Sequence, residues 1–488
     1  MRRRTAASLA LFVLSATLVL TSIAPSSAGT WQRPRLRLIA AETEVELVRY
    51  SPRQAFDMRV GMWLASLRAP FELQVERRVY GEPIRAFEVI RSDDGQVRRN
   101  PLPDGLVTSW DGLDDFFRLV VTDDAGAQVK ARRFGLCPNA WEQQRVNDRG
   151  PVRATYPATC GGNPFTQGMV WGVDQGWAAS IADRAPSLKL DDGSYTATVS
   201  ILQPYRELFR IADADATAQV HLSVRTDDWC EWCADERAAT DRAPDGRLTE
   251  AATLSSPDPS TLPDLRSLPA YGIVVQRQQR RDWLTFGADV WNAGPAPLVV
   301  EGFRREGEPL MDAFQYFFRD GEVVGRSRVG GFEYDERDGH DHWHFRQFAG
   351  YRLLDATRSN PVVSTKEAFC LVPTDAVDLL VSGASYRPDL DGLWTACGWV
   401  GSIWIRETLP AGWGDTYHQS LPGQSFDISD LPNGTYWIEI AANPKGKLYE
   451  RRTDNGVSYR KVILGGSPGA RTVDVPAYKG IDSEAGWR

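Results

Sequence analysis

Three of the five histidines in this protein, His340, His342 and His344, lie within a five-residue stretch. Successive side chains of an extended strand point to opposite faces, so these three imidazoles would project from one face of such a strand. Trp343 and Phe345 would project from the other face, where their rings would be buried. Three neutral imidazoles on one face suit copper, zinc, iron or nickel. The stretch therefore predicts a metal site, and the alternative is an exposed, histidine-rich strand without an ion.

Length and composition set limits on the rest of the chain. At 488 residues the chain is too long for one ordinary core, which favours two domains. Thirty prolines, 42 glycines and many short runs of Val, Ile, Tyr and Trp favour a loop-rich β protein. The net charge of −8 argues against nucleic acid and anionic membrane surfaces as partners.

The N-terminus has the pattern of a signal peptide. Arg2, Arg3 and Arg4 precede an apolar run over residues 6–23, and small residues follow at 26–28. We expect cleavage after residue 28 and a secreted chain, with an uncleaved anchor as the alternative. No later segment is long and apolar enough to predict a membrane span. The six cysteines are then candidates for disulfides.

Short strand-like runs separated by turn residues fill most of the chain. In the first part they are Leu38–Val48, Phe56–Leu67, Phe71–Val79, Phe117–Thr122, Ser194–Leu202 and Ala218–Val224. A polar stretch without apolar periodicity, residues 234–261, predicts a linker. We therefore expect one β domain at 29–233, a second at 262–465, and a C-terminal tail at 466–488.

The second part of the chain repeats signals of the first in the same order. The matches are Trp63 with Trp291, Gly81-Glu82-Pro83 with Gly307-Glu308-Pro309, Asp94-Gly95 with Asp320-Gly321, Arg118-Leu119 with Arg352-Leu353, and Gly193-Ser194-Tyr195 with Gly434-Thr435-Tyr436. Cys137 and Cys160 likewise match Cys370 and Cys397. The pattern predicts a tandem duplication of one β-sandwich-like domain.

The repeat makes predictions about cysteines and ligands. It favours the disulfides Cys137–Cys160 and Cys370–Cys397, each within one copy. Cys230 and Cys233 remain as a local structural disulfide, with a redox pair as the alternative. The three histidines fall on Leu106, Thr108 and Trp110 of the first copy, so any metal site belongs to the second.

Downstream of the histidines, further motifs follow in a fixed order. They are Tyr351-Arg352-Leu353-Leu354-Asp355, Lys366-Glu367-Ala368-Phe369-Cys370-Leu371, Asp415-Thr416-Tyr417, Gly434-Thr435-Tyr436 and Asn443-Pro444. Together with the histidines, this ordered set resembles the lysyl oxidase family of secreted copper amine oxidases, over residues 262–464.

The resemblance implies that His340, His342 and His344 bind copper and that Lys366 and Tyr417 form a lysine tyrosylquinone cofactor. It implies oxidation of a primary amine, or of lysine in a protein, to an aldehyde, with O2 consumed and ammonia and hydrogen peroxide released. The first copy has Arg133 at the position of Lys366 and Trp177 near that of Tyr417, so we expect it to be non-catalytic.

Other roles are less specific. Asp415 and Asp355 are candidates for the base that removes the α-proton, and Asp415 is favoured by its nearness to Tyr417. His418 is either a supporting group or a polar neighbour of Tyr417. The family's calcium site is matched at Asp264, Leu265, Glu450 and Asn455. Arg452 stands where a carboxylate is expected, which disfavours calcium.

Two alternatives to the amine oxidase remain. One is a secreted β-sandwich binding or adhesion protein that holds a metal without forming the quinone. The other is a zinc or iron enzyme that uses the three histidines alone. Neither requires Lys366 or Tyr417, whose presence favours the oxidase.

Overall fold

The computed structural model describes residues 29–49, 54–226, 248, 251–305, 308–336, 342–365, 368–389 and 392–486. The predicted signal peptide, Cys230, Cys233, His340 and Lys366 lie outside the described residues, as does most of the predicted linker. Within the described part, strands dominate, with one short α-helix, α1 (Gln203–Phe209), and three 3-10 turns. The all-β fold class is confirmed. None of the helices in the described part has the length and apolar composition needed to cross a bilayer.

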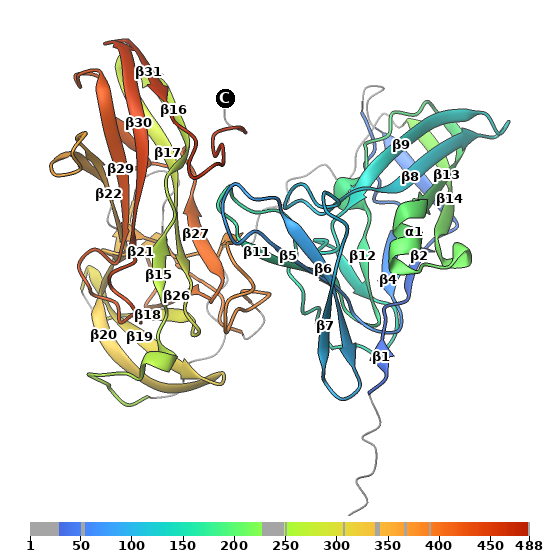
Figure 1. Ribbon diagram of the computed structural model, residues 1–488, viewed down its shortest axis with the longest axis horizontal. Helices are drawn as coiled ribbons and strands as arrows, with labels where there is room; N and C mark the ends of the chain where they lie inside the picture. The colour runs from blue at the N-terminus through green and yellow to red at the C-terminus, as the bar shows by residue number, and fades with distance from the viewer. Residues whose placement is uncertain are drawn as a thin grey trace, which may run out of the picture.

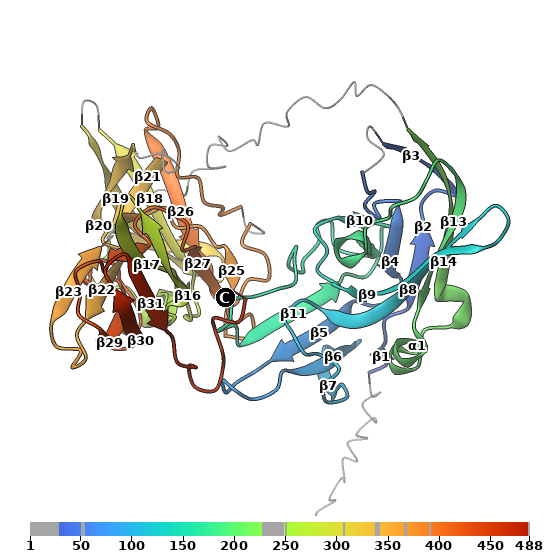
Figure 2. The same ribbon diagram turned by 90° about the horizontal axis from the view of Figure 1, so that it is seen from above.

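The strands form two groups that stand side by side in the molecule (Figures 1 and 2). We call residues 29–226 the first half and residues 251–486 the second half. Each of the six sheets takes all its strands from one half.

The first half contains three sheets. Its strands are β1 (Trp31–Gln32), β2 (Leu36–Ala40), β3 (Glu44–Arg49), β4 (Met62–Ser66), β5 (Phe71–Glu76), β6 (Arg85–Ser92), β7 (Val97–Pro101), β8 (Leu113–Asp123), β9 (Gln128–Leu136), β10 (Gln143–Arg145), β11 (Gly168–Val173), β12 (Trp177–Ser180), β13 (Gly193–Ile201) and β14 (Thr217–Thr226).

The second half also contains three sheets. Its strands are β15 (Leu265–Ser267), β16 (Tyr271–Gln278), β17 (Arg281–Asn292), β18 (Leu298–Arg304), β19 (Leu310–Arg319), β20 (Glu322–Asp335), β21 (His342–Arg346), β22 (Ala349–Leu354), β23 (Pro361–Thr365), β24 (Ala368–Phe369), β25 (Asp375–Ala376), β26 (Trp404–Leu409), β27 (Trp413–Tyr417), β28 (Ser425–Asp427), β29 (Gly434–Ala442), β30 (Val457–Ser467) and β31 (Ala470–Asp474).

The two halves order corresponding strands in the same way. The run β7-β6-β5-β11 has the order of β20-β19-β18-β26, and β12-β4-β2 has the order of β27-β17-β15. The run β14-β13-β8-β9 has the order of β30-β29-β22-β23. When the strands of the two halves are matched in this way, their order along the chain is also the same in both halves. The common order supports the prediction of a duplication.

Matched residues share local geometry as well. Gly193 and Gly434, which begin β13 and β29, both have a φ of 151°, a left-handed conformation that favours glycine. The tyrosine two residues on donates its hydroxyl to the carbonyl four residues back, at 3.0 Å from Tyr195 and 2.9 Å from Tyr436. Both halves therefore keep the same corner between strands.

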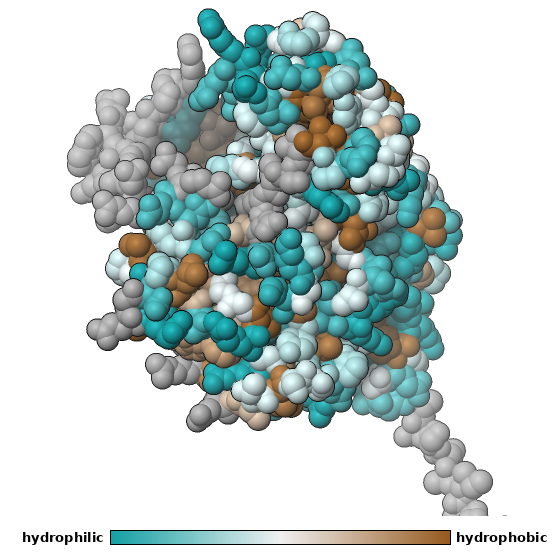
Figure 3. Space-filling model, turned by 90° about the vertical axis from the view of Figure 1, so that its left-hand side faces the viewer, coloured by the Kyte–Doolittle hydropathy of each residue, from teal (hydrophilic) through white to brown (hydrophobic). Residues whose placement is uncertain are grey.

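The alternation of apolar and polar residues explains why strands at the surface, such as β14, form. In β14, Ala218, Val220, Leu222 and Val224 are buried and the residues between them are exposed, so one face packs on the core. The face of the second half in Figure 3 is mainly hydrophilic, with apolar residues in small, separate groups. On this face most apolar side chains of the strands therefore point into the core.

Most predicted strands of the first half are present, although the run Phe56–Leu67 is a strand only over Met62–Ser66. The expected run Leu38–Val48 is broken after Ala40, because β2 pairs with β4 whereas β3 runs parallel to β14 in another sheet. The end of the predicted linker is also ordered, since the Leu254 amide donates to the Arg326 carbonyl at 2.9 Å beside β20.

The predicted tail begins as regular structure. Strand β31 lies within it and pairs with β30. Beyond β31 the chain passes between the halves (Figure 2), and Tyr478 packs edge-on against Phe165 of the first half at 5.6 Å between ring centroids. Glu484 is buried and accepts a hydrogen bond from the Ile273 amide at 2.6 Å.

Candidate active site

The described part of the histidine stretch is strand β21, which pairs antiparallel with β20. His342 and His344 project from one face, with ring centroids 4.8 Å apart. Trp343 and Phe345 project from the other face and are 1% and 0% exposed. The alternation expected from the sequence is therefore present in the part of the stretch that the structure describes.

Aromatic pairs fix the register of this strand. Trp343 lies opposite Tyr334, and Phe345 lies opposite Phe332, both in edge-to-face geometry with ring centroids 5.7 and 5.4 Å apart. Such cross-strand pairs add to the stability of a sheet. A slip of one residue would turn both imidazoles into the aromatic core, so the register keeps them on their own face.

Asp335, at the end of β20, lies beside the histidines. Its Oδ2 is 3.4 Å from Nδ1 of His344, and the two side chains are 10% and 1% exposed. A carboxylate at one ring nitrogen orients an imidazole and raises its basicity, which leaves Nε2 for a metal. Nothing in the sequence indicated that Asp335, rather than its neighbours, would take this position.

The edges of the histidine sheet are bridged by one segment. The Trp343 amide donates to the Cys397 carbonyl at 3.0 Å, and Ala396 pairs with Arg406 of β26. Residues 396–397 thus connect β21 with β26, which lie far apart in the sheet order. The sheet curls as a result, and the disulfide Cys370–Cys397 lies at the join.

Tyr417 ends strand β27 and is 8% exposed. Its hydroxyl donates to the Cys370 carbonyl at 2.9 Å and accepts from the Cys370 amide at 3.0 Å. Burial, followed by the nearby carboxyls of Asp415 and Glu407, raises the pKa of Tyr417 well above its usual value. The phenol is therefore neutral, and its hydroxyl position is fixed by two backbone bonds.

Strand β24 connects the histidine strand with Tyr417 through contacts on the aromatic face of the sheet. Phe369 of β24 pairs with Phe345 of β21, and the Tyr417 ring meets the Phe369 ring edge-on at 4.8 Å. Lys366 precedes β24 by two residues but lies outside the described residues. Because Phe369 lies opposite Phe345 in register, the Tyr417 ring packs on the aromatic face of this sheet, whereas His342 and His344 project from the other face.

Two carboxyls are buried near Tyr417. Asp415 is 4% exposed and precedes Tyr417 by two residues on β27, which places both on one face. Glu407 of β26 is 0% exposed, and burial raises its pKa well above the usual value, with Asp415 adding to the effect. Sequence reasoning missed Glu407. Its position between Ile405 and Leu409 in an alternating apolar strand was the available signal.

Two other sequence candidates stand apart from this group. Asp355 is in a turn, where bonds from the side chains of Thr357 and Asn360 lower its pKa to about 2. A carboxyl of that acidity is a weak base. The Nδ1 atom of His418 lies 3.1 Å from the Ser420 hydroxyl.

Comparison with known proteins agrees with this geometry. Residues 326–469 match the lysyl oxidase family. The match begins in β20, contains the histidine strand and Tyr417, and ends after β30. A chicken (Gallus gallus) protein, lysyl oxidase homolog 2, is 24% identical over 160 residues. That alignment covers 33% of this chain and 18% of the relative, so the chain spans less than a fifth of that relative's length.

The donor set on β21 fits copper. Imidazole is a good ligand for copper, and Asp335 supplies the carboxylate that ligating histidines commonly have. Among the described residues, Cys370, Cys397 and Glu407 also cluster closely enough to suggest a metal. Both sulfurs are consumed by the disulfide, so this second cluster offers no thiolate.

The residues at the calcium position do not fit a calcium ion. Asp264, Glu450 and Asn455 do gather there, and Asn455 donates to Asp264 at 2.9 Å. However, the guanidinium of Arg266 already pairs with Asp264 at 2.6 Å. Burial also raises the pKa of Glu450 to about 7, which weakens it as an anionic ligand. The positive charge of Arg266 thus lies beside Asp264, where a calcium ion would have to bind.

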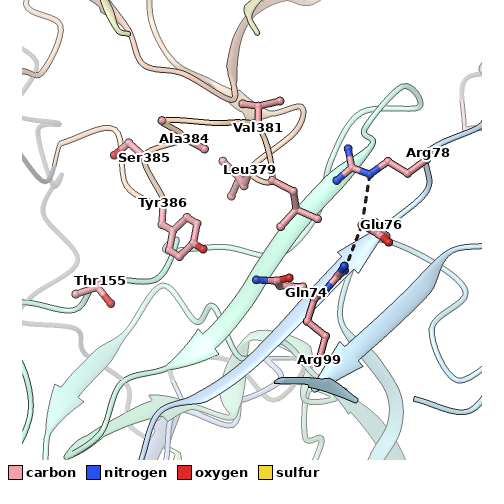
Figure 4. A pocket seen from close by; sticks show the side chains of 12 residues that line it. Gln74, Glu76, Arg78, Arg99, Thr155, Leu379, Val381, Ala384, Ser385 and Tyr386 are labelled. Carbon is pink, nitrogen blue, oxygen red and sulfur yellow. Dashed lines mark hydrogen bonds and ion pairs between the residues drawn. The ribbon is translucent and has the colours of Figure 1, made fainter. Parts of the chain in front are cut away.

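A cavity of about 660 Å³ opens between the two halves (Figure 4). The first half lines it with Gln74, Glu76, Arg78, Arg99 and Thr155, and the second half lines it with residues of the segment 379–386. Arg78 and Arg99 both pair with Glu76, at 3.3 and 3.2 Å. Among the predicted site residues that the structure describes, none lines this cavity.

Proposed function

We propose that the second half is a copper-dependent oxidase of primary amines, including lysine in proteins, with a quinone derived from Lys366 and Tyr417. The products would be an aldehyde, ammonia and hydrogen peroxide, with O2 as the oxidant. The observation that carries the proposal is strand β24, two residues after Lys366, which pairs with the histidine strand and packs Phe369 against the buried Tyr417. The family match over 326–469 supports it.

His342 and His344 would bind copper together with His340. Copper, when bound, supplies the redox chemistry with O2 that modifies the tyrosine. Asp335 lies at Nδ1 of the His344 ring, which would leave Nε2 for the metal. The burial of Trp343 and Phe345 behind the strand makes the histidine face rigid.

Tyr417 would serve as the ring precursor because its hydroxyl is held between the amide and carbonyl of Cys370. The quinone, when formed, supplies an electrophilic carbonyl for the substrate amine. Asp415, on the same face of β27, is the residue that would accept the α-proton from the substrate carbon. Its carboxyl is buried and so is sheltered from bulk water.

The first half would be a non-catalytic copy that packs against the second, with the domain limits 29–233 and 262–465 given above. Strand β12 corresponds to β27, but Trp177 begins β12 as Trp413 begins β27, each after a glycine with positive φ. The expected match of Trp177 with Tyr417 is therefore wrong, and Ile181 stands at the position of Tyr417. By its sequence spacing from the matched cysteine, Arg133 would stand for Lys366, and arginine remains protonated and cannot add to a quinone. We further propose that the whole chain is secreted after removal of residues 1–28.

Peptide mapping by mass spectrometry of the copper-loaded protein tests the proposal. Wild type should yield the Lys366 and Tyr417 peptides as one oxidised, cross-linked species and should release peroxide with a primary amine. Tyr417→Phe should abolish both signals while it retains copper. Two unmodified peptides from fully loaded wild type would favour the metal-holding binding protein.

Tyr436→Phe is a matched control for this experiment. Tyr436 is also 8% exposed, and its hydroxyl also donates to one carbonyl at 2.9 Å, that of Pro432. Its loss should cost similar stability, about 1 kcal/mol, without affecting the cross-link.

A further inference from the structure

One segment of the first half, residues 163–168, is embedded in the second half. The Gln167 amide donates to the Val377 carbonyl at 2.8 Å, and the Leu379 amide donates to the Gly168 carbonyl at 2.8 Å. These bonds form a short parallel bridge between Gly168, which begins β11, and Asp378. The backbones of the halves are thereby joined.

Phe165 provides the apolar part of this contact. It is 0% exposed and belongs to a cluster with second-half residues Leu268, Tyr271, Trp291 and Val377. Its ring meets that of Tyr271 at 6.0 Å and that of Tyr478 at 5.6 Å, both edge-to-face. Removing this ring from water favours the association of the two surfaces.

Asn163 provides the polar part. It is 6% exposed, and its Nδ2 donates to Oδ2 of Asp289 at 3.0 Å. The same oxygen accepts the Thr416 hydroxyl at 2.9 Å. The amide of the first half and the hydroxyl of β27 are therefore held by one buried carboxyl of β17.

The Asp289 carboxyl lies against β27, on the face opposite to the one that carries Asp415 and Tyr417. Asp289 is paired in register with Thr416, which stands between Asp415 and Tyr417 on β27. Because side chains alternate, Thr416 faces Asp289 and the first half, whereas Asp415 and Tyr417 face the other side. The contact is close, since a Cβ at Gly414 would lie 2.3 Å from Oδ1 of Asp289.

We propose that residues 163–168 of the first half form a clamp that holds β27 in place, with Asn163 as its positioning residue and Phe165 as its apolar anchor. Its effect on Tyr417 rests on the function proposed above. Without the clamp, β27 would lose its support on one face, while the histidine strand β21, in another sheet, would remain intact.

Hydrogen exchange of the full-length protein tests the clamp without any need for the quinone. Asn163→Ala should make exchange of the peptide over residues 413–417 about tenfold faster than in wild type, because local opening becomes easier. Exchange of β21 and copper binding should be unchanged. Equal exchange of residues 413–417 in Asn163→Ala and wild type would overturn the proposal.

Asn100→Ala is the matched control, because Asn100 also donates its Nδ2 to a carboxylate, Oε2 of Glu88 at 3.3 Å, entirely within the first half. It should leave residues 413–417 unaffected. Phe165→Leu is a milder second variant that keeps apolar volume but loses the ring contacts. It should also accelerate exchange at 413–417, and no acceleration there would count against the clamp.

Asn163→Asp gives a readout that a general loss of packing would not give. The introduced carboxyl and that of Asp289 would share one proton at pH 6 and repel each other at pH 9, when both are charged. Besides Asp289, the groups that face this point are Asp375, Tyr271 and Tyr80. Exchange at 413–417 should match wild type at pH 6 and exceed it at pH 9. The same ratio to wild type at both pH values would overturn the role of Asn163.

Peptide mapping separates this inference from the proposed function. If wild type forms the cross-link, Asn163→Ala should lower its yield with copper retained, and an unchanged yield would show that the clamp on β27 does not position Tyr417. If wild type forms no cross-link, the proposed function fails. The exchange measurement decides for or against the clamp in either case.

Discussion

In the proposed copper site, Asp335 is the residue that contacts the histidine pair most directly. It lies 3.4 Å from the Nδ1 of His344 in a position that is almost closed to solvent. Ligating imidazoles depend on such a partner for orientation and basicity. Copper affinity should therefore respond to a change that leaves every ligand in place.

Asp335→Asn should weaken copper binding by about 10- to 100-fold, because a neutral amide replaces the carboxylate at the imidazole. Competition against a chelator of known affinity measures the change. Asp312→Asn is the control, since Asp312 also lies in this sheet but pairs with Arg328 at 2.5 Å. Equal copper affinity in Asp335→Asn and wild type would show that Asp335 has no such role.

At the residue scale the sequence predicted the alternation of His342, Trp343, His344 and Phe345, because that depends only on the strand period. It did not predict Asp335 or Glu407. Their positions beside the site depend on which strands pair and in which register, and many polar residues along the chain would fit equally well. A pairing partner is a property of the fold that local periodicity does not contain.

At the scale of elements, the disulfide Cys370–Cys397 joins the strand that follows Lys366 to the segment that closes the histidine sheet. The repeat predicted both this disulfide and Cys137–Cys160, and both are present. The two bonds enclose loops of similar length but differ in their surroundings. Removing each disulfide in turn therefore distinguishes an effect on overall stability from an effect on the position of the site residues.

Cys370→Ala with Cys397→Ala should cost about 3 kcal/mol of unfolding free energy and also lower the yield of the Lys366–Tyr417 cross-link. Cys137→Ala with Cys160→Ala should cost a similar amount, since the sequence separations are 27 and 23. The second pair should leave the cross-link unchanged. Thermal melting and peptide mapping measure the two effects. If both double variants keep the full cross-link, the site disulfide serves stability alone.

The correspondence between strands of the two halves was the feature of the fold that the sequence predicted best. Trp63 and Trp291 do lie in corresponding strands, β4 and β17, and Arg118 and Arg352 lie in β8 and β22. The sheet order itself was beyond prediction, since it depends on contacts between strands far apart in the chain. The break at residues 41–43 has the same origin, because β2 and β3 join different sheets.

At the scale of the whole molecule, the halves meet through a buried carboxyl. Asn163 and Asp289 are 126 residues apart in sequence, and nothing in either local sequence indicates that they meet. Burial, with Asp375 nearby, raises the pKa of Asp289 to about 8. The carboxyl is therefore mostly neutral in the folded protein at pH 7, although it would be charged in the unfolded chain.

This difference makes stability depend on pH with a definite sign. A carboxyl whose pKa is raised by folding favours the folded state fully below its unfolded value of 3.8. That advantage is lost as the pH rises from about 4 to about 8, because the unfolded state gains a charge that the folded state resists. Above about 8 both states are charged, and no further loss arises from this group.

Asp289→Asn should therefore raise the melting temperature relative to wild type at pH 8 and have little effect at pH 4. The difference in unfolding free energy at pH 8 should reach a few kcal/mol, since each pKa unit corresponds to about 1.4 kcal/mol. Asp378→Asn is the interface control with the opposite sign, because it removes the negative charge that pairs with Arg78 at 2.6 Å. It should lower the melting temperature at both pH values. A fall for Asp289→Asn at pH 8 would mean that the folded protein needs a charged Asp289 at the join between its halves.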